Sequence, residues 1–330
     1  MLAIGDFVAY VRRPTADTTL PHTEADLALL QLLQALKSGD YGFVTPTPAT
    51  HARVTARPGK QRAKTVRDVF GWSLPFEPEV VGEEILGLME RGGVLQRGEG
   101  GLRSAVRVSN LNGWLFLHSA YPTDEEDSVF FGPDTYRFVS FIEEELSNGG
   151  EGGLVVDIGA GSGAGGLVAA VNRPGARLLL SDVNAKALRL ARINAAHAGI
   201  EADTVQASGV EAVTEPIDVA IANPPYMIDS EGRTYREGGD MHGAGLSLEW
   251  AKSAAERLAP GGRLLMYTGA AIVDGRDAFR EAVGAAMDAA GCEWRYRELD
   301  PDVFGEELER DAYRDVERIA AVGLAARKRG

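Results

Sequence analysis

From residue 153 onward, strand-like and helix-like segments alternate strictly along the chain. Parallel neighbouring strands need a long crossover connection, so this alternation predicts an α/β protein with a mostly parallel sheet and helices on both faces. The expected strands are "LVVDIG", "ARLLLSD", "DTVQAS", "IDVAIAN" and "GRLLMYTG", and the expected helices cover 164–172, 184–198, 246–259 and 276–290.

The end of the chain departs from this alternation. "WRYREL" and "ERIAAVGLAA" are two further strand candidates, and no full crossover helix is indicated between them. They are therefore expected to form an antiparallel edge, which brings the sheet to seven strands. Before the first strand, "GPDTYRFVSFIEEEL" has the apolar periodicity of an amphipathic helix.

Residues 1–129 show a different pattern, and 330 residues exceed one typical domain. We therefore expect an N-terminal domain over 1–129 and a second domain over 130–330. The first domain is predicted to hold a helix over 23–36, a connector with little regular structure over 45–59, helices in "KQRAKTVRDVF" and "PEVVGEEILGLMERGG", and a hairpin of "RSAVRVS" and "GWLFLHSA" around Asn112-Gly113. Helices followed by a hairpin are the order of a winged-helix module; a small packing domain of the same elements is the alternative.

Composition excludes several classes of protein. No stretch approaches 18 uncharged apolar residues, which argues against a membrane span. Asp6 interrupts the first apolar run and no basic segment precedes it, unlike a signal peptide. Cys292 is the only cysteine, so no internal disulfide can form, as expected of a cytoplasmic protein.

Charge is unevenly distributed along the chain, whose net charge is −14. Residues 1–75 hold nine Lys/Arg against six Asp/Glu, whereas the remainder holds 25 against 42. Any contact with a polyanion is therefore expected from the N-terminal part. The run "HARVTARPGKQRAKTVR" holds six basic residues and no acid, which indicates either a nucleic-acid contact or an exposed connector.

The turn after the first strand of the alternating part is rich in glycine. In "VVDIGAGSGAGGL", Gly161, Gly163 and Gly166 satisfy G-x-G-x-x-G, a pattern that a dinucleotide loop and a tight turn without a ligand both explain. Asp157 precedes the glycines at the strand end, where a carboxylate suits a cationic ligand better than a pyrophosphate. Asp182 ends the second strand, placed either to accept ribose hydroxyls or to cap the following helix.

Asn223-Pro224-Pro225-Tyr226 follows the fourth predicted strand. Pro has no backbone N–H and a fixed φ, so this tetrapeptide ends the strand at the sheet edge where ligands bind. The Asn223 side-chain oxygen and the Pro224 carbonyl can accept the two N–H bonds of an amino group, and Tyr226 can stack on a planar group. The alternative is a strand stop without a catalytic role.

Together these motifs resemble class I S-adenosylmethionine-dependent methyltransferases over about residues 130–330, with their Rossmann-like seven-stranded sheet. The resemblance implies S-adenosyl-L-methionine as the cofactor. It implies that the methionine part is held by Asp157, Gly159, Gly161 and Gly163, and the ribose by Asp182. The family usually places an acid against the adenine, where "QASGV" offers Ser208 instead.

Asn-Pro-Pro-Tyr resembles the signature of the amino-methyltransferase branch, which implies N-methylation of an exocyclic base amine or a glutamine amide. The nearest resemblances are to release-factor glutamine methyltransferases and small-domain RNA base methyltransferases. "FFGPDTYRF" occupies the place of a segment that covers the cofactor in the glutamine enzymes, which implies a contact from Thr135.

The leading functional hypothesis is methylation of an rRNA or tRNA base, because of the N-terminal module and the basic run. Glutamine methylation of a release factor or other protein is the alternative. An NAD-dependent dehydrogenase and a non-enzymatic winged-helix regulator are the competing classes, and the first leaves Asn-Pro-Pro-Tyr unexplained. The loop 227–244 is expected to act as a substrate lid. Two possible ligands, Asp240 and His242, do not predict a metal site.

Overall fold

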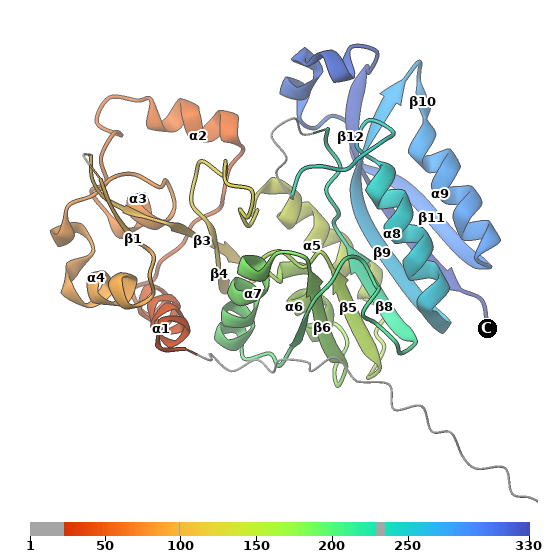
Figure 1. The fold of residues 1–330 in the computed structure, drawn as a ribbon, viewed down its shortest axis with the longest axis horizontal. Coiled ribbons are helices and arrows are strands. Elements are labelled where there is room, and N and C mark those ends of the chain that lie inside the picture. The colour runs from red at the N-terminus through yellow and green to blue at the C-terminus, as the bar shows by residue number, and fades with distance from the viewer. Residues whose placement is uncertain (1–22, 99, 229–234) are drawn as a thin grey trace, which may run out of the picture.

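The structure of the protein, a computed structural model, describes residues 23–98, 100–228 and 235–330. One sheet in the C-terminal part has the strand order β7-β6-β5-β8-β9-β12-β11, and the short β10 (Arg276–Asp277) pairs with β9 (Figure 1). The strands are β5 (Leu154–Ile158), β6 (Arg177–Asp182), β7 (Asp203–Gln206), β8 (Ile217–Ala222), β9 (Leu258–Val273), β11 (Cys292–Asp300) and β12 (Arg318–Lys328).

The strands β5 to β9 run parallel to their neighbours, whereas β12 is antiparallel to both β9 and β11. The predicted fold class, a mostly parallel sheet with an antiparallel edge, is therefore confirmed. Every residue of β5 is buried, as expected of a central strand covered on both faces. The chain order reverses between β5 and β8, and this switch point is where an open α/β sheet binds its ligands.

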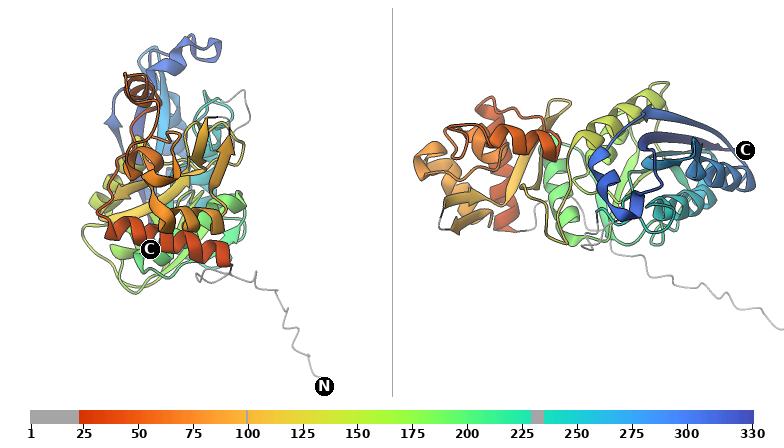
Figure 2. Two further views of the ribbon diagram at one scale, coloured as in Figure 1. Left: turned by 90° about the vertical axis from the view of Figure 1, so that its left-hand side faces the viewer. Right: turned by 90° about the horizontal axis from the view of Figure 1, so that it is seen from above.

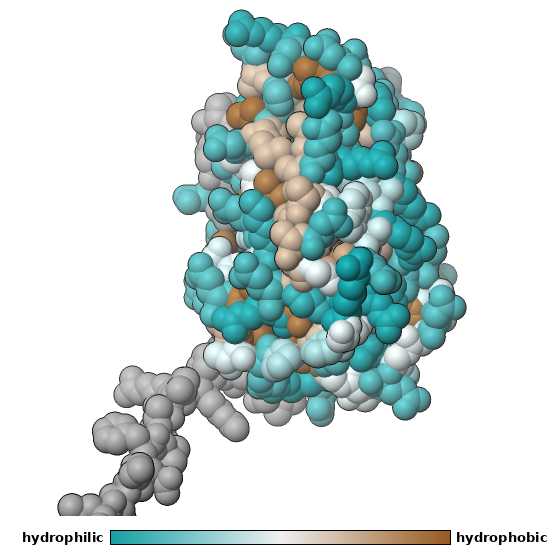
Figure 3. Space-filling model, turned by 90° about the vertical axis from the view of Figure 1, so that its right-hand side faces the viewer, coloured by the Kyte–Doolittle hydropathy of each residue, from teal (hydrophilic) through white to brown (hydrophobic). Residues whose placement is uncertain are grey.

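Helices cover both faces of the sheet. One apolar core joins β5 and β6 to α5 (Pro133–Leu146), α6 (Ala164–Val171) and α7 (Ala185–Ala198), and the other joins β8 and β9 to α8 (Gly245–Arg257) and α9 (Ala278–Ala289). Each of these helices lies within a few residues of its predicted bounds. The surface around α9 and β11 is largely hydrophilic, with a narrow band of weakly hydrophobic residues (Figure 3).

The N-terminal part forms a lobe beside the sheet (Figure 2). Its elements are α1 (Glu24–Ser38), α2 (Pro48–Thr55), α3 (Val66–Phe70), α4 (Gly82–Arg91) and two hairpins, β1 (Leu95–Gly98) with β2 (Gly101–Ser104) and β3 (Val106–Leu111) with β4 (Trp114–Ser119). The turn predicted at Asn112-Gly113 joins β3 and β4, and both of its residues have positive φ.

Three local predictions for this lobe are wrong. The connector 45–59 contains α2, because Thr47 caps the helix and Pro48 occupies its first turn, where a missing N–H costs nothing. The helix expected over 60–70 is confined to α3, whose capping box begins only at Thr65. "RSAVRVS" is not one strand, since it is divided between β2 and β3.

The lobe is attached to the sheet through α7. The Arg189 Nε donates to Asp26 Oδ1 of α1 at 2.6 Å. Asn194 pairs with both backbone groups of Leu117 in β4 and also donates to the Ser162 carbonyl of the glycine-rich turn. One helix therefore connects the N-terminal lobe directly to the turn that begins the predicted cofactor site.

No helix in the described ranges 23–98, 100–228 and 235–330 is long and apolar enough to span a membrane.

Candidate active site

A cavity of about 600 Å³ lies at the carboxyl ends of β5, β6 and β8, between the sheet and the N-terminal lobe. Ten of the eleven site residues predicted from the sequence line this one cavity: Thr135, Asp157, Gly159, Gly161, Asp182, Ser208, Asn223, Pro224, Pro225 and Tyr226. The eleventh, Gly163, lies between the lining residues Ser162 and Ala164. The fold thus brings together residues that follow or end β5, β6, β7 and β8 and one residue of α5.

The glycine-rich turn after β5 has a geometry that requires glycine at Gly159. Its φ is +69°, and an added Cβ would come within 2.7 Å of the Trp250 ring of α8. Gly161 also has positive φ, but a Cβ there would meet nothing within 4 Å. Gly163 is the N-cap of α6, with a φ of +81°. The turn therefore exposes backbone to open space at Gly161, as the cradle of a cofactor must.

Asp157 is only 1% exposed, and its Oδ2 accepts a hydrogen bond from the Gly166 N–H at 2.7 Å. Burial, together with the nearby charge of Asp182, raises the pKa of Asp157 to about 7, although the Gly166 hydrogen bond opposes the shift. Asp157 therefore fastens the first turn of α6 to the end of β5. A direct contact with the cofactor stays a prediction.

Asp182 holds the same turn from the neighbouring strand. Its Oδ2 accepts from the Gly161 N–H and its Oδ1 from the Asn184 N–H, both at 2.8 Å. Burial raises the pKa of Asp182. The side-chain cap of α7 is Asn184, so Asp182 does not serve as the helix cap that was its alternative role.

Two further positions line the cavity near Asp182. Ser208 is exposed there. Val183, which sequence reasoning did not single out, is 45% exposed, unusual for a large apolar side chain, and offers a flat contact for a planar ring. Thr135 also lines the cavity, but its Oγ1 accepts from the Gly132 N–H and so caps α5.

Asn223 has the most informative geometry in the site. Its Oδ1 is buried and has no hydrogen-bond partner among the described residues. A buried acceptor left unpaired costs free energy, so such an atom needs a reason to persist. Asn223 follows the carboxyl end of β8 and lines the cavity. Its Oδ1 can therefore accept a hydrogen bond from an N–H of the group that is to be methylated.

Tyr226 is held against β9. A Cβ at Gly269 would come within 2.3 Å of the Tyr226 ring, so only glycine at this position leaves room for the ring. Tyr267 and Phe304 contact the ring edge to face, with centroids 6.5 Å and 6.0 Å away. Burial and the neighbouring Asp134 carboxylate raise the pKa of Tyr226 well above its usual value.

Asp134 was missed by sequence reasoning. It is buried at the start of α5 and accepts a 2.6 Å hydrogen bond from the Tyr267 hydroxyl. Arg137 bridges Asp134 to Asp300 of β11. Burial raises the pKa of Asp134. The one signal in the sequence was its position, because Asp134 is the acid that directly precedes Thr135 in the segment predicted to cover the cofactor.

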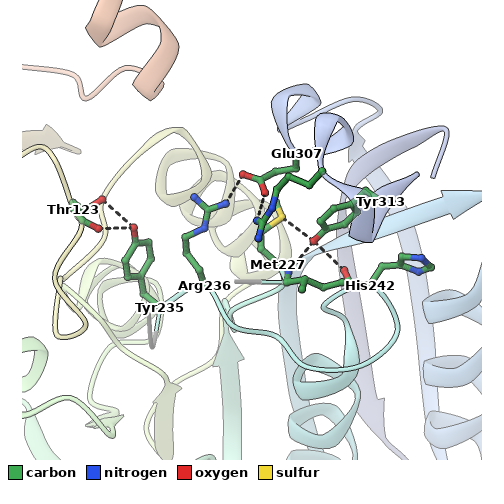
Figure 4. A network of polar contacts seen from close by, with 9 residues as sticks. Thr123, Met227, Tyr235, Arg236, His242, Glu307 and Tyr313 are labelled. Atoms are coloured by element: carbon green, nitrogen blue, oxygen red, sulfur yellow. Dashed lines mark hydrogen bonds and ion pairs between the residues drawn. The ribbon is translucent and has the colours of Figure 1, made fainter. Parts of the chain in front are cut away.

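The predicted lid, 227–244, contains residues 229–234, which lie outside the described residues. Around them, the Tyr313 hydroxyl accepts from the Ile228 N–H at 2.8 Å, and Arg236 pairs with Glu307 (Figure 4). Tyr235 donates to the Thr123 carbonyl at 3.0 Å. The described parts of the loop are thus joined to residues 307–313 through Ile228 and Arg236, and to Thr123 through Tyr235.

The two loop residues considered as metal ligands are not part of a cluster. His242 Nε2 lies 3.2 Å from Asp315 Oδ1, and no group of three potential metal ligands occurs within the described ranges.

The six residues of the basic run are exposed, but not all are available. Lys60 lies 3.5 Å from Asp68, and Arg62 pairs with Glu77. Arg67 donates to the Gly42 carbonyl and lies over the Phe43 ring. Arg53, Arg57 and Lys64 form no ion pair with another described residue.

The chain was compared with known proteins. Residues 138–286, somewhat less than half of the chain, match the model of the methyltransferase small domain. The predicted resemblance to S-adenosylmethionine-dependent methyltransferases is therefore confirmed over these residues.

Curated relatives fall into two groups. The chain is 32% identical over 141 residues to the release factor glutamine methyltransferase of Chlorobaculum tepidum, covering 39% of this chain and 48% of the relative. It is 29% identical over 217 residues to that of Deinococcus radiodurans, covering 62% and 74%. It is also 39% identical over 74 residues to the ribosomal RNA small subunit methyltransferase C of an Enterobacter species, covering 22% of each chain.

The chain thus spans about half the length of the Chlorobaculum relative. Among solved structures, it is similar to a 16S rRNA N2 methyltransferase from T. thermophilus in complex with AdoMet and guanosine. That similarity has 18% identity and a TM-score of 0.45, covering 78% of this chain and 64% of the other.

Proposed function

We propose that this protein transfers a methyl group from S-adenosylmethionine to a planar amino nitrogen, and that the nitrogen is the exocyclic amine of an RNA base. The observation that carries the proposal is the buried Oδ1 of Asn223 at the end of β8, which has no hydrogen-bond partner among the described residues. An amino group that donates one N–H to this oxygen satisfies it. An acceptor without N–H groups would leave the buried oxygen unpaired.

The residues of the cavity fit the cofactor. Gly161 presents bare backbone to open space, and Asp182 and Val183 lie beside it at the end of β6. These residues would hold S-adenosylmethionine, whose sulfonium supplies an electrophilic methyl group when it is bound. Asp157 positions α6 and the turn rather than the reacting atoms.

The chain's own contribution to the reaction is orientation. A planar nitrogen is a poor nucleophile because its lone pair is delocalised. Asn223 Oδ1 and the Pro224 carbonyl accept its two N–H bonds, which aims the lone pair at the methyl group and stabilises the positive charge that grows on nitrogen. Bound S-adenosylmethionine would supply the methyl group, its S–C bond breaking as the N–C bond forms, and Asn223 and Pro224 would keep the nitrogen aligned until one N–H proton leaves to solvent. Such positioning can lower a two-body barrier by ~7–11 kcal/mol.

A base fits the aromatic lining of the cavity. Tyr226 is fixed against Gly269 with Phe304 beside it, and Phe130 stacks on Tyr235 with a centroid distance of 5.8 Å. Aromatic faces are how unpaired bases are usually held. On this proposal residues 1–129 form the domain that recognises the RNA, and the protein acts in the cytoplasm.

Glutamine methylation is the second candidate, because in sequence the two release factor glutamine methyltransferases match a larger part of this chain, 39% and 62%, than the Enterobacter ribosomal RNA methyltransferase, 22%. A glutamine amide also presents two N–H bonds to Asn223.

The test is methyl transfer from isotope-labelled S-adenosylmethionine to RNA and protein fractions of a strain that lacks the gene. Label in a base of the RNA fraction is expected, whereas label in glutamine would select the second candidate. Asp182→Ala should abolish most S-adenosylhomocysteine binding, since charge-assisted hydrogen bonds contribute roughly 1.5–3 kcal/mol each. Binding of NAD in place of S-adenosylhomocysteine would overturn the proposal.

A further inference from the structure

The wall of the cavity that the N-terminal lobe provides contains a buried arginine. Arg107 of β3 is 4% exposed and lines the cavity. Its Nε donates to the Gly71 carbonyl at 2.8 Å, and its Nη2 lies 3.5 Å from His51 Nδ1. Its Nη1 makes no hydrogen bond to any residue within the described ranges.

No carboxylate in the described part of the chain forms an ion pair with Arg107. The guanidinium lies over the Phe43 ring, 5.4 Å from its centroid, and its electrostatic neighbours are the hydroxyl groups of Tyr41, Tyr136 and Tyr121. Burial lowers the pKa of Arg107 to about 10, so it stays charged at neutral pH. Asp124 also lines the cavity, but it is exposed and does not contact the guanidinium. A buried charge without a counterion is costly, so its position in a cavity wall points to an anionic ligand.

The surroundings of Arg107 favour an anion as well. Thr47, Pro48 and Ala49 line the same cavity and form the beginning of α2. Pro48 has no N–H, and the Thr50 and His51 N–H groups donate to Thr47, so the Ala49 N–H is the donor of this turn that has no acceptor among the described residues. Burial, and then the charge of Arg107, lower the pKa of His51 to about 4, so this histidine is neutral. Because Arg107 donates to its Nδ1, the His51 proton is assigned to Nε2, which is a further donor.

We propose that Arg107, His51 and the first turn of α2 form an oxyanion subsite that binds a phosphate of the acceptor nucleotide. This proposal rests on the proposed function, because it concerns the same cavity and names the substrate class as a nucleotide rather than a glutamine side chain.

The distribution of charge in the cavity agrees with this assignment. Asp182 lines the sheet side, where the cationic cofactor would lie, whereas the buried cation Arg107 lies in the lobe. A glutamine amide brings no negative charge to Arg107. A nucleotide brings both a planar amine for Asn223 and a phosphate for the lobe.

The experiment compares the affinities of nucleosides and their 5′-monophosphates for the full chain in the presence of S-adenosylhomocysteine. Adenosine, guanosine, AMP and GMP are measured by calorimetry. At least one monophosphate should bind on the order of ten- to a hundredfold more tightly than its nucleoside, the effect of a charge-assisted hydrogen bond. Arg107→Gln should remove most of that preference, and Arg107→Lys should retain part of it.

Arg103→Gln is the matched control. Arg103 lies on the neighbouring strand β2 and also donates to a backbone carbonyl, that of Ser73, but it is exposed and outside the cavity. This variant should keep the full preference. If Arg107→Gln fails to fold, His51→Ala and the wild-type comparison still provide the test.

Equal affinity of wild type for nucleosides and monophosphates would overturn the subsite, as would an unchanged preference in Arg107→Gln. Tighter binding of a glutamine peptide with acidic neighbours, lost in Arg107→Gln, would assign the subsite to a protein and overturn the nucleotide proposal. Failure of the proposed function is distinguishable, because it would show as absent S-adenosylhomocysteine binding or as label in glutamine in the methyl-transfer assay, whatever the phosphate preference.

Discussion

The ring of Tyr226 lies on the backbone of Gly269, so closely that a Cβ on the glycine would come within 2.3 Å of the ring. The two residues belong to different segments, the loop after β8 and the middle of β9. The absence of a side chain at Gly269 therefore determines how closely the Tyr226 ring approaches β9. On the proposed function, this also sets the position of the ring on which the methyl acceptor would stack.

Gly269→Ala should displace Tyr226 and lower the rate of methyl transfer by tenfold or more, because a positioning residue that is misplaced by about 1 Å can cost on the order of a hundredfold in rate. S-adenosylhomocysteine affinity should stay within a few-fold, since the cofactor residues are elsewhere. Gly98→Ala is the control, because a Cβ on this exposed glycine would meet nothing within 4 Å. Normal turnover of the Gly269→Ala variant would show that the position of the ring is unimportant.

Replacing Tyr226 itself separates its ring from its hydroxyl. Tyr226→Phe keeps the ring on Gly269 and should change turnover only mildly, whereas Tyr226→Ala removes the stacking surface and should be severe. Steady-state kinetics on the same acceptor measures both. Equal losses of turnover in the two variants would show that the Tyr226 hydroxyl, beside Asp134, is needed rather than the ring.

Asn223→Ala should slow methyl transfer about a hundredfold, the effect of losing one preorganised group, or ~3 kcal/mol. The free energy of unfolding should not fall, because the side-chain oxygen has no partner in the described structure to lose. Asn194→Ala is the contrasting control: this buried asparagine makes three backbone hydrogen bonds, and its loss should destabilise the fold by at least ~1–3 kcal/mol. Thermal unfolding of both variants decides, and a destabilised Asn223→Ala protein would mean that the oxygen has a structural partner.

Asp157 should make stability depend on pH in the direction opposite to that of an ion-paired carboxylate. Its pKa rises from 3.8 to about 7 on folding, so the folded state holds a proton that the unfolded state releases. The stabilising contribution is complete below pH ~4 and is lost as pH rises towards 7, by up to ~4 kcal/mol. Asp157→Asn should remove this slope while still accepting from Gly166. Denaturant unfolding between pH 4 and 8 compares the two proteins, and parallel curves would contradict the shift.

The basic run should contribute to RNA affinity only through its unpaired residues. Replacing Arg53, Arg57 and Lys64 with Gln should flatten the slope of log affinity against log salt by about 2, at roughly 0.7 for each phosphate contact on a single strand. Replacing Lys60 and Arg62, which already pair with Asp68 and Glu77, should change the slope less. RNA affinity measured at two salt concentrations gives this slope for each variant. An unchanged slope in the triple variant would exclude the basic run from the RNA interface.

Much of the fold follows from local pattern. The period of the apolar residues from 153 onward determines which segments are strands and which are helices, and the crossover rule then requires a parallel sheet. The same reasoning was wrong over 45–59. Pro and Thr usually indicate a loop, but in α2 they occupy the N-cap and first turn, the two places where a helix accepts them.

Sequence alone determined the reactive backbone of the site. Two motifs favour the same local conformations wherever they occur: the glycine-rich turn after one strand and Asn-Pro-Pro-Tyr after another. Glycine permits positive φ, and proline has a fixed φ and no N–H, whatever surrounds them. The tertiary structure alone decided what surrounds them. The Tyr267 hydroxyl meets Asp134, 133 residues away in the chain, Gly269 lies beneath Tyr226, and Arg107 enters the cavity from another lobe. These contacts depend on how layers pack, and no local pattern encodes the distance between two side chains so far apart in the chain.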